Sequence, residues 1–225
     1  MFGYGIELSL EDYIQRSVYL GTYERRESSL IKRHLTSGMT FLDVGANIGY
    51  YSLMAAAVAG PSGRIVAFEP NPHIFNHFKR TIEKNRISHI TLEQYALADA
   101  AGTCELFVPI EAGNNTATMI ANEGGSPVSV PVITLDDYLD RNDIEHVDFM
   151  KIDVEGYEPR IIAGAQATIK AKKIDAILCE FSGHWLRQDG TTPQDFYEFM
   201  RSLGLRASEQ RTPNTEFENI LFTPH

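Results

Sequence analysis

The stretch FLDVGANIGYYSL, residues 41–53, joins an apolar run to an acidic residue, two glycines and a second apolar run. The first run is typical of a buried strand, and the glycines allow a tight turn into the helix that the second run predicts. The N–H groups at the start of such a helix favour an anionic group. Because similar turns also occur without a ligand, residues elsewhere in the chain must decide what this one binds.

The composition is that of a globular protein. The chain has 225 residues, of which 43% are hydrophobic and 22% charged, and its formal net charge is -10. A chain of this length can bury a large core as one unit, so we expect a single α/β domain over residues 1–225. The negative charge would repel a phosphate backbone and argues against nucleic acid as a partner.

The N-terminal sequence, MFGYGIELSLED, lacks the cationic start and apolar middle of a signal peptide. The longest apolar stretch is shorter than the ~20 residues that span a bilayer, so no membrane partner is expected. Cys104 and Cys179 are the only cysteines and do not form a CxxC pair. This usage fits a reducing compartment and predicts a cytoplasmic protein.

Apolar runs alternate with helical patterns along most of the chain. Strands are expected at residues 39–44, 64–70, 89–99, 147–154, 175–181, 205–210 and 218–223. Helices are expected over residues 48–59, 72–86, 134–139 and 158–172, and from Thr192 to Gly204. Near-continuous apolar strands that alternate with helices predict a parallel sheet covered on both faces.

Two segments fall outside this alternation. Residues 1–38 are expected to form two helices, the first with a capping box at Ser9 and Asp12 and the second over residues 24–34. We expect this segment to act as a lid. Residues 102–133 hold the turn-rich sequences GNNTATM and GGSPVSVPV and are expected to form a hairpin-like insertion.

Acidic residues are expected at the ends of three adjacent strands, where ligands of parallel α/β sheets bind. Asp43 would repel a pyrophosphate, and the G-x-x-x-G spacing after it is not the dinucleotide fingerprint G-x-G-x-x-G. Glu69 can accept hydrogen bonds from both hydroxyls of a ribose. Asp99 can accept from an adenine amine, or can be a turn residue before Gly102. S-adenosylmethionine combines a cation, a ribose, an adenine and a carboxylate, and so fits these groups.

Six motifs occur in a defined order between about Gly21 and Phe181: GTYE, FLDVGANIGYYSL, VAFEPNP, ALAD, KIDVEGYE and LCEF. Together they resemble the S-adenosylmethionine-dependent methyltransferases of the FkbM type, within the Rossmann-like class I group. The resemblance implies a mostly parallel seven-stranded sheet with helices on both faces and an antiparallel last strand. It also implies methyl transfer to a hydroxyl of a small molecule such as a sugar, a polyketide or another natural product.

The resemblance implies a cofactor role for residues of several motifs. Those of the first strand and turn would contact the methionine part, Glu69 the ribose, the residues after it the adenine side, and ALAD the adenine edge. Glu24 would help to close the site. The residues concerned are Glu24, Asp43, Gly45, Asn47, Gly49, Glu69, Pro70, Asn71, Ala98 and Asp99.

An alcohol acceptor also needs a group that takes its proton. Asp153 and Glu155 after the fourth expected strand, and His184 in the loop SGHW after the fifth, are the candidates. The two acids could instead order the DVEG turn, and His184 could be an exposed loop residue. His73 and His77 lie four apart, but HIFNH lacks the glutamate of H-E-x-x-H, so no metal site is expected.

Two other functions stay open. A non-catalytic S-adenosylmethionine-binding protein would keep the cofactor site and lack an acceptor pocket. A nucleotide-cofactor oxidoreductase is opposed by the missing dinucleotide fingerprint and by Asp43. The sequence does not identify the acceptor, and it is compatible with a homo-oligomer.

Overall fold

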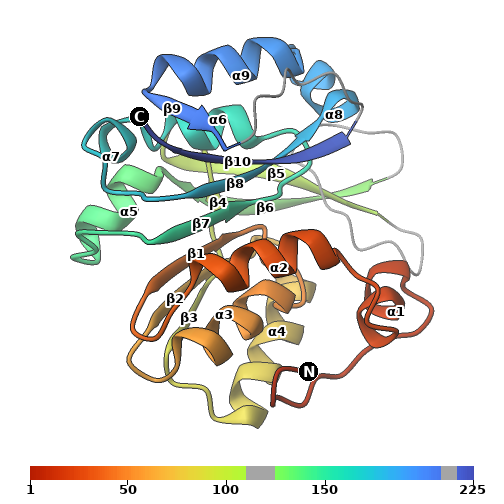
Figure 1. Ribbon diagram of the computed structural model, residues 1–225. Helices are drawn as coiled ribbons and strands as arrows, with labels where there is room; N and C mark the ends of the chain where they lie inside the picture. The colour runs from red at the N-terminus through yellow and green to blue at the C-terminus, as the bar shows by residue number, and fades with distance from the viewer. Residues whose placement is uncertain (110–124, 209–216) are drawn as a thin grey trace.

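The structure is a computed structural model that describes residues 1–109, 125–208 and 217–225. Figure 1 shows a central sheet with helices on both sides. In spatial order its strands are β3 (Ile90–Glu93), β2 (Arg64–Phe68), β1 (Thr40–Val44), β7 (Phe149–Ile152), β8 (Ile177–Ser182), β10 (Phe217–Pro224) and β9 (Leu205–Ala207). Neighbours from β3 to β8 pair in parallel, whereas β10 is antiparallel to both β8 and β9. The predicted seven-stranded sheet with its antiparallel last strand is confirmed.

Alternate residues of the central strands enter two separate cores. In β1, Leu42 and Val44 lie in one core and Phe41 in the other. The first core is closed by α5 (Leu135–Arg141), α6 (Glu158–Ala163), α7 (Gln166–Lys170) and α9 (Pro193–Ser202). The second is closed by α2 (Arg25–His34), α3 (Tyr50–Ala59) and α4 (Pro72–Asn85). Both faces are therefore covered, as the apolar strands predict.

The first helix, α1 (Tyr13–Tyr19), begins three residues later than a capping box at Ser9 predicts. Asp12 is the cap itself, and its carboxylate accepts a hydrogen bond from the N–H of Gln15 at 2.7 Å. The Gln15 side chain in turn accepts from the N–H of Ser9 at 2.7 Å. The predicted capping box of Ser9 with Asp12 was wrong, because the side chain that accepts from the Ser9 N–H is that of Gln15 and not that of Asp12.

The expected strand over residues 89–99 is two strands in different sheets. β3 ends at Glu93, and β4 (Ala96–Leu97) joins a second sheet in the order β4, β6, β5. In this sheet β5 (Gly102–Pro109) and β6 (Gly125–Ile133) pair antiparallel. The sequence GNNTATM, residues 113–119, lies outside the described residues. Ala96, Ala98 and three apolar residues of β5 and β6 form a small core of their own, which draws the chain away from the central sheet.

The helix expected over residues 158–172 is broken into α6 and α7. A Cβ on Gly164 would lie 2.1 Å from the carbonyl oxygen of Ala98, so only glycine permits this approach to β4. The carboxylate of Asp136 then accepts from the N–H groups of Ala167 and Thr168, both at 2.9 Å, and starts the second helix. Asp136 also lies in the first turn of its own helix, α5.

The segment SGHW is not a loop but the start of a short helix, α8 (Gly183–Gln188). The expected strand over residues 205–210 ends at Ala207, and its last two positions lie outside the described residues. Within residues 1–109, 125–208 and 217–225, no helix combines the length and the apolar character that a membrane crossing requires.

Candidate active site

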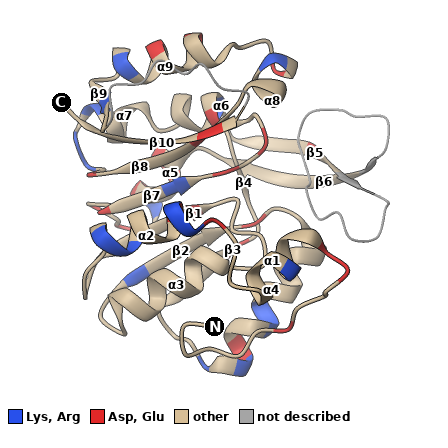
Figure 2. Cartoon of the chain, turned by 45° about the vertical axis from the view of Figure 1, so that its right-hand side comes forward, with Lys and Arg blue, Asp and Glu red and all other residues tan. Residues whose placement is uncertain are grey.

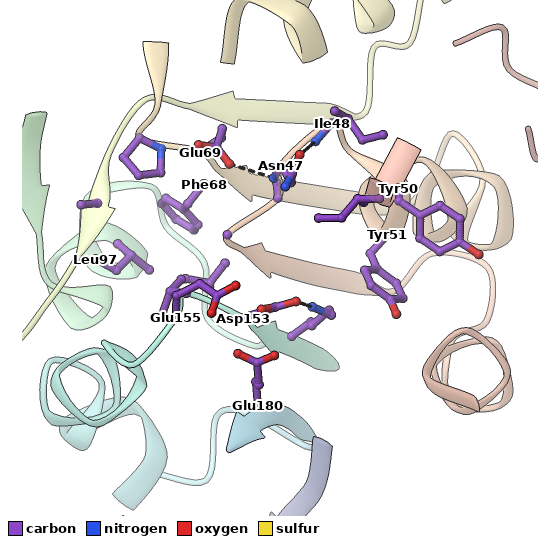
Figure 3. A pocket seen from close by; sticks show the side chains of 18 of the residues that line it. Asn47, Ile48, Tyr50, Tyr51, Phe68, Glu69, Leu97, Asp153, Glu155 and Glu180 are labelled. Carbon is purple, nitrogen blue, oxygen red and sulfur yellow. Dashed lines mark hydrogen bonds and ion pairs between the residues drawn. The ribbon is translucent and has the colours of Figure 1, made fainter. Parts of the chain in front are cut away.

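A cavity of about 290 Å³ lies at the carboxyl ends of β1, β2, β7 and β8 (Figure 3). This is the edge of the sheet at which the strand order reverses between β1 and β7, where ligands of such sheets bind. The charged side chains that line it are one lysine and five acids: Lys151, Glu24, Glu69, Asp153, Glu155 and Glu180. Aromatic and apolar residues form the rest of the wall, among them Tyr13, Ile14, Tyr23, Tyr50, Tyr51, Phe68, Tyr95 and Phe217.

The glycine turn after β1 bonds mainly to the protein itself. Gly45 has φ +83, and a Cβ there would lie 2.0 Å from the carbonyl oxygen of Asp153, so glycine lets the exits of β1 and β7 approach each other. The N–H groups of the turn donate to acceptors within the protein. Those of Gly45 and Ala46 donate to the carbonyl oxygen of Phe68, and that of Gly49 donates to the carbonyl oxygen of Ala46. The N–H of Asn47 donates to the Glu69 carboxylate, and the N–H of Ile48 donates to the Asn47 side chain. The expectation that the N–H groups from Ile48 onward would be free for an anion was wrong for Ile48 and Gly49.

Glu69 follows β2 and is 7% exposed, with its carboxylate held from two sides. Oε2 accepts from the N–H of Asn47 at 2.8 Å, and Oε1 accepts from the N–H of Asn71 at 2.9 Å. Burial raises the pKa of Glu69 to about 7, although both hydrogen bonds lower it. The carboxylate is thus fixed in place at the cavity wall and retains lone pairs for a ligand hydroxyl.

Asp43 and Gly49 lie behind the cavity wall. Asp43 is buried, and its carboxylate accepts from the hydroxyl of Ser52 at 2.6 Å. Burial raises its pKa, against the effect of the Lys151 ammonium. A Cβ on Gly49 would lie 2.1 Å from the ring of Phe78, which packs there from α4. Both residues shape the turn but do not line the cavity.

Lys151 is the central cation of the site and is only 2% exposed. Its ammonium lies 2.6 Å from Asp153 Oδ2 and 4.6 Å from the centre of the Tyr51 ring. Burial alone would lower the pKa of Lys151, but the carboxylates of Asp153, Glu24 and Asp43 raise it above its ordinary value. Lys151 is the one charged residue of β7, whose sequence is FMKI, and Figure 2 shows a blue segment in that strand.

The N-terminal segment reaches the site through Glu24. This residue has a left-handed backbone, with φ 33, and its carboxylate accepts a hydrogen bond from the hydroxyl of Tyr51. Burial raises the pKa of Glu24, and the ammonium of Lys151 opposes this effect. Tyr23 and Tyr50 pack edge to face beside this pair, with ring centres 5.0 Å apart.

Asp153 and Glu155 both line the cavity, and Glu180 from β8 joins them. One carboxylate oxygen of each lies within 4.8 Å of the others. Burial, followed by the charges of Asp153 and Glu158, raises the pKa of Glu155 to about 8. The structure therefore brings together two of the three predicted proton acceptors with a third acid that was not predicted.

Several predicted site residues do not reach the cavity. His184 is exposed on α8, where its Nε2 lies 2.9 Å from the side-chain nitrogen of Gln188. Asp99 is exposed and Ala98 faces Gly164, because the chain has left the central sheet before them. Asn71 caps α4 by accepting from the N–H of His73 at 3.0 Å. The predicted residues in the lining are Glu24, Gly45, Asn47, Glu69, Pro70, Asp153 and Glu155.

Three functional candidates were missed. Lys151 and Glu180 stand inside the motifs KIDVEG and LCEF, and a charged residue within an otherwise apolar strand was the available signal. Tyr95 precedes β4 and lines the cavity together with Ala96 and Leu97. These three lining residues lie two to three positions before the predicted Ala98 and Asp99.

The lining suits a ligand with positive charge. Five acidic side chains face one ammonium, so the cavity offers carboxyl groups to a cationic ligand, whose charge would favour their ionised form. S-adenosylmethionine has a sulfonium and an ammonium against a single carboxylate, and its ribose offers two hydroxyl donors. The donor and acceptor set therefore fits this cofactor better than a pyrophosphate.

Known proteins with related sequences are methyltransferases. The 27% identity with the hexuronic acid methyltransferase AglP from Haloferax volcanii covers 54% of this chain and 48% of that protein. The 31-O-demethyl-FK506 methyltransferase FkbM from Streptomyces tacrolimicus is 29% identical over 59% of this chain and 61% of that protein. The chain thus aligns with about half to three fifths of the length of these relatives.

A solved FkbM methyltransferase from Methylobacillus flagellatus has a similar fold, with a TM-score of 0.56 and 16% identity over 84% of this chain and 44% of that one. An S-adenosylmethionine-dependent O-methyltransferase from Thermotoga maritima gives a TM-score of 0.51 at 13% identity, over 90% of this chain and 65% of that one. The sequence model of the Methyltransferase FkbM domain matches residues 43–207. Since this match covers well over half of the chain, the protein belongs to the FkbM methyltransferase domain family.

Proposed function

We propose that the protein is an S-adenosylmethionine-dependent methyltransferase that methylates a hydroxyl of a small molecule. The observation that carries this proposal is the cavity at the switch point of a family-typical sheet, lined by five acids and one lysine. The acidic side chains fit the cationic part of the cofactor, and the buried carboxyl group of Glu69 fits its ribose. When bound, the cofactor supplies an electrophilic methyl group on its sulfonium.

The chain's own residues would mainly position the reactants. Methyl transfer is an in-line displacement, so the acceptor oxygen must be held about 3 Å from the methyl carbon and in line with the bond that breaks. The rings of Tyr23, Tyr50 and Tyr51 pack against one another in the cavity wall and would serve this purpose. Asp153 and Glu155 are the proposed proton acceptors at the cavity edge.

The proposed acceptor class follows from the lining and from the relatives. The names of two relatives specify a hexuronic acid and 31-O-demethyl-FK506 as substrates, and the second name places the methyl group on oxygen. In this chain Tyr13, Ile14 and Phe217 give the cavity mouth an apolar rim. These features support an acceptor that presents a hydroxyl on an apolar or cyclic body.

Calorimetry with S-adenosylhomocysteine, NAD and NADP tests the cofactor. We expect binding of S-adenosylhomocysteine alone. Tight NAD binding with no response to S-adenosylhomocysteine would contradict the proposal and favour an oxidoreductase.

Catalysis needs a separate test. Labelled methyl groups from S-adenosylmethionine should appear in a hydroxylated metabolite of a source-organism extract, and mass spectrometry should locate the label on oxygen. Cofactor binding with no labelled product in any extract would favour the non-catalytic binding protein.

A further inference from the structure

Three carboxylate side chains converge at the cavity edge between β7 and β8. One oxygen from each of Asp153, Glu155 and Glu180 lies within 4.8 Å of the other two, and Figure 3 shows their side chains around one space. Opposite ligands of an octahedral ion with bonds of about 2.1 Å lie about 4.2 Å apart, so these oxygens can reach a common ion. We infer that Asp153, Glu155 and Glu180 form a binding site for a divalent cation of the Mg²⁺ or Mn²⁺ type.

Glu180 gives a second, independent indication of a ligand. This side chain is 3% exposed, and its buried Oε2 atom has no hydrogen-bond partner among the residues that the structure describes. A buried carboxylate oxygen without a partner is costly, and natural proteins rarely leave one so. An ion at the cluster would supply the missing partner.

The protein's own cation does not neutralise this cluster. The Lys151 ammonium lies beside Asp153 at 2.6 Å, and five carboxylates against one ammonium leave four formal negative charges in the lining. A divalent cation at the cluster would offset part of this formal excess.

The donor set decides the class of the ion. All three side chains offer carboxylate oxygen, which suits Mg²⁺, Mn²⁺ or Ca²⁺, whereas zinc sites usually contain histidine nitrogen or cysteine sulfur. A cation at this edge would also draw electron density from an acceptor hydroxyl and ease the loss of its proton to a carboxylate. This use of the ion rests on the proposed function, whereas its binding does not.

Mn²⁺ binding can be measured directly on the full chain. Protein treated with EDTA is titrated with Mn²⁺ while electron paramagnetic resonance follows the free ion. We expect one Mn²⁺ per chain, displaced by millimolar Mg²⁺. Glu180→Gln should weaken the affinity by about tenfold or more, because it removes a charged ligand. Unchanged affinity in a folded Glu180→Gln protein overturns the site.

A matched control tests a second group with the same ligand spacing. His146, Asp148 and Asp175 also lie within 4.8 Å of one another, but on the surface at the opposite edge of the sheet. Asp175→Asn should leave Mn²⁺ binding unchanged. If Asp175→Asn removes binding and Glu180→Gln does not, the ion belongs to the surface group and the inference is wrong. Should Glu180→Gln fail to fold, Glu155→Gln takes its place, with the same expected loss.

The outcome of the Mn²⁺ titration can be distinguished from the outcome of the cofactor-binding test of the proposed function. Calorimetry with S-adenosylhomocysteine in EDTA reports cofactor binding without any ion. Saturable Mn²⁺ binding without S-adenosylhomocysteine binding would support the ion site while the proposed function fails. S-adenosylhomocysteine binding with no saturable Mn²⁺ site would support the proposed function and overturn the ion site.

Discussion

The hydroxyl of Tyr51 on α3 donates a hydrogen bond to the carboxylate of Glu24, the residue that precedes α2. Both side chains line the cavity, and the Lys151 ammonium lies over the Tyr51 ring at 4.6 Å. The N-terminal segment is thereby joined to the central sheet at the candidate active site. Burial, followed by the charge of Glu24, raises the pKa of Tyr51, so its hydroxyl stays a donor at all ordinary pH values.

Tyr51→Phe should therefore loosen the N-terminal segment. We expect a loss of about 1–3 kcal/mol in the free energy of unfolding, since the partly buried carboxylate of Glu24 would lose this donor. Chemical denaturation measures this loss, and limited proteolysis should cut the region before α2 faster. Tyr19→Phe is the control, because Tyr19 is 67% exposed. Equal stability of the two variants would show that the bond does not hold the segment.

Gly45→Ala should disrupt the turn after β1. The added Cβ would lie 2.0 Å from the carbonyl oxygen of Asp153, at a backbone φ of +83 that alanine rarely adopts. We expect the free energy of unfolding to fall by about 3 kcal/mol or more, together with loss of S-adenosylhomocysteine binding. Gly102→Ala is a matched control, because no atom lies within 4 Å of its new Cβ. A folded Gly45→Ala protein of native stability would contradict the close approach of β1 and β7.

Lys151→Met should destabilise the protein although methionine is apolar. Removing the ammonium leaves Asp153 beside other buried acids without its partner at 2.6 Å, and breaking a buried pair in this way costs about 3–5 kcal/mol. Thermal and denaturant unfolding measure the effect. Lys84→Met removes an exposed ion pair with Glu7, in which the two side chains are 61% and 66% exposed, and should change the stability far less. Similar losses in both variants would mean that Lys151 is not the cation that holds the site.

The central sheet could be predicted from the sequence because its strands are short apolar runs that alternate with helices. The pattern failed where a tertiary contact and not local composition decides the element. Gly164 breaks a continuous helical pattern only because its backbone touches Ala98. Residues 89–99 read as one strand, although a small separate core takes Ala96 and its neighbours into the second sheet.

The candidate site was predictable where a residue's position follows from a strand end. Glu69 and Asp153 directly follow their strands and line the cavity, as this rule predicts. His184 was placed in a loop, but it lies in α8 and points elsewhere. Lys151 and Glu180 face the cavity from within β7 and β8, and sequence alone does not reveal which face of a doubly covered strand a polar residue occupies.

Binding of S-adenosylhomocysteine should depend on pH through Glu69. Burial raises the pKa of this carboxyl to about 7, with a smaller contribution in the same direction from Asp43, so below that pH it carries a proton in the free protein. Ribose hydroxyls donate to the ionised form, so binding below pH 7 must first release this proton. Affinity should therefore rise with pH up to about 7, by at most about tenfold per pH unit, and then level off.

The variant Glu69→Gln isolates this effect from other groups of the site. Glutamine does not titrate, so its profile should lack the rise that Glu69 causes, and affinity at pH 8 should be about ten- to hundredfold lower than in the unchanged protein. Calorimetry from pH 5.5 to 8.5 gives both profiles, and the difference between them belongs to Glu69. Glu145→Gln, an exposed position at the opposite edge of the sheet, should keep the original profile. Parallel profiles for the unchanged protein and Glu69→Gln would remove Glu69 from the ribose site.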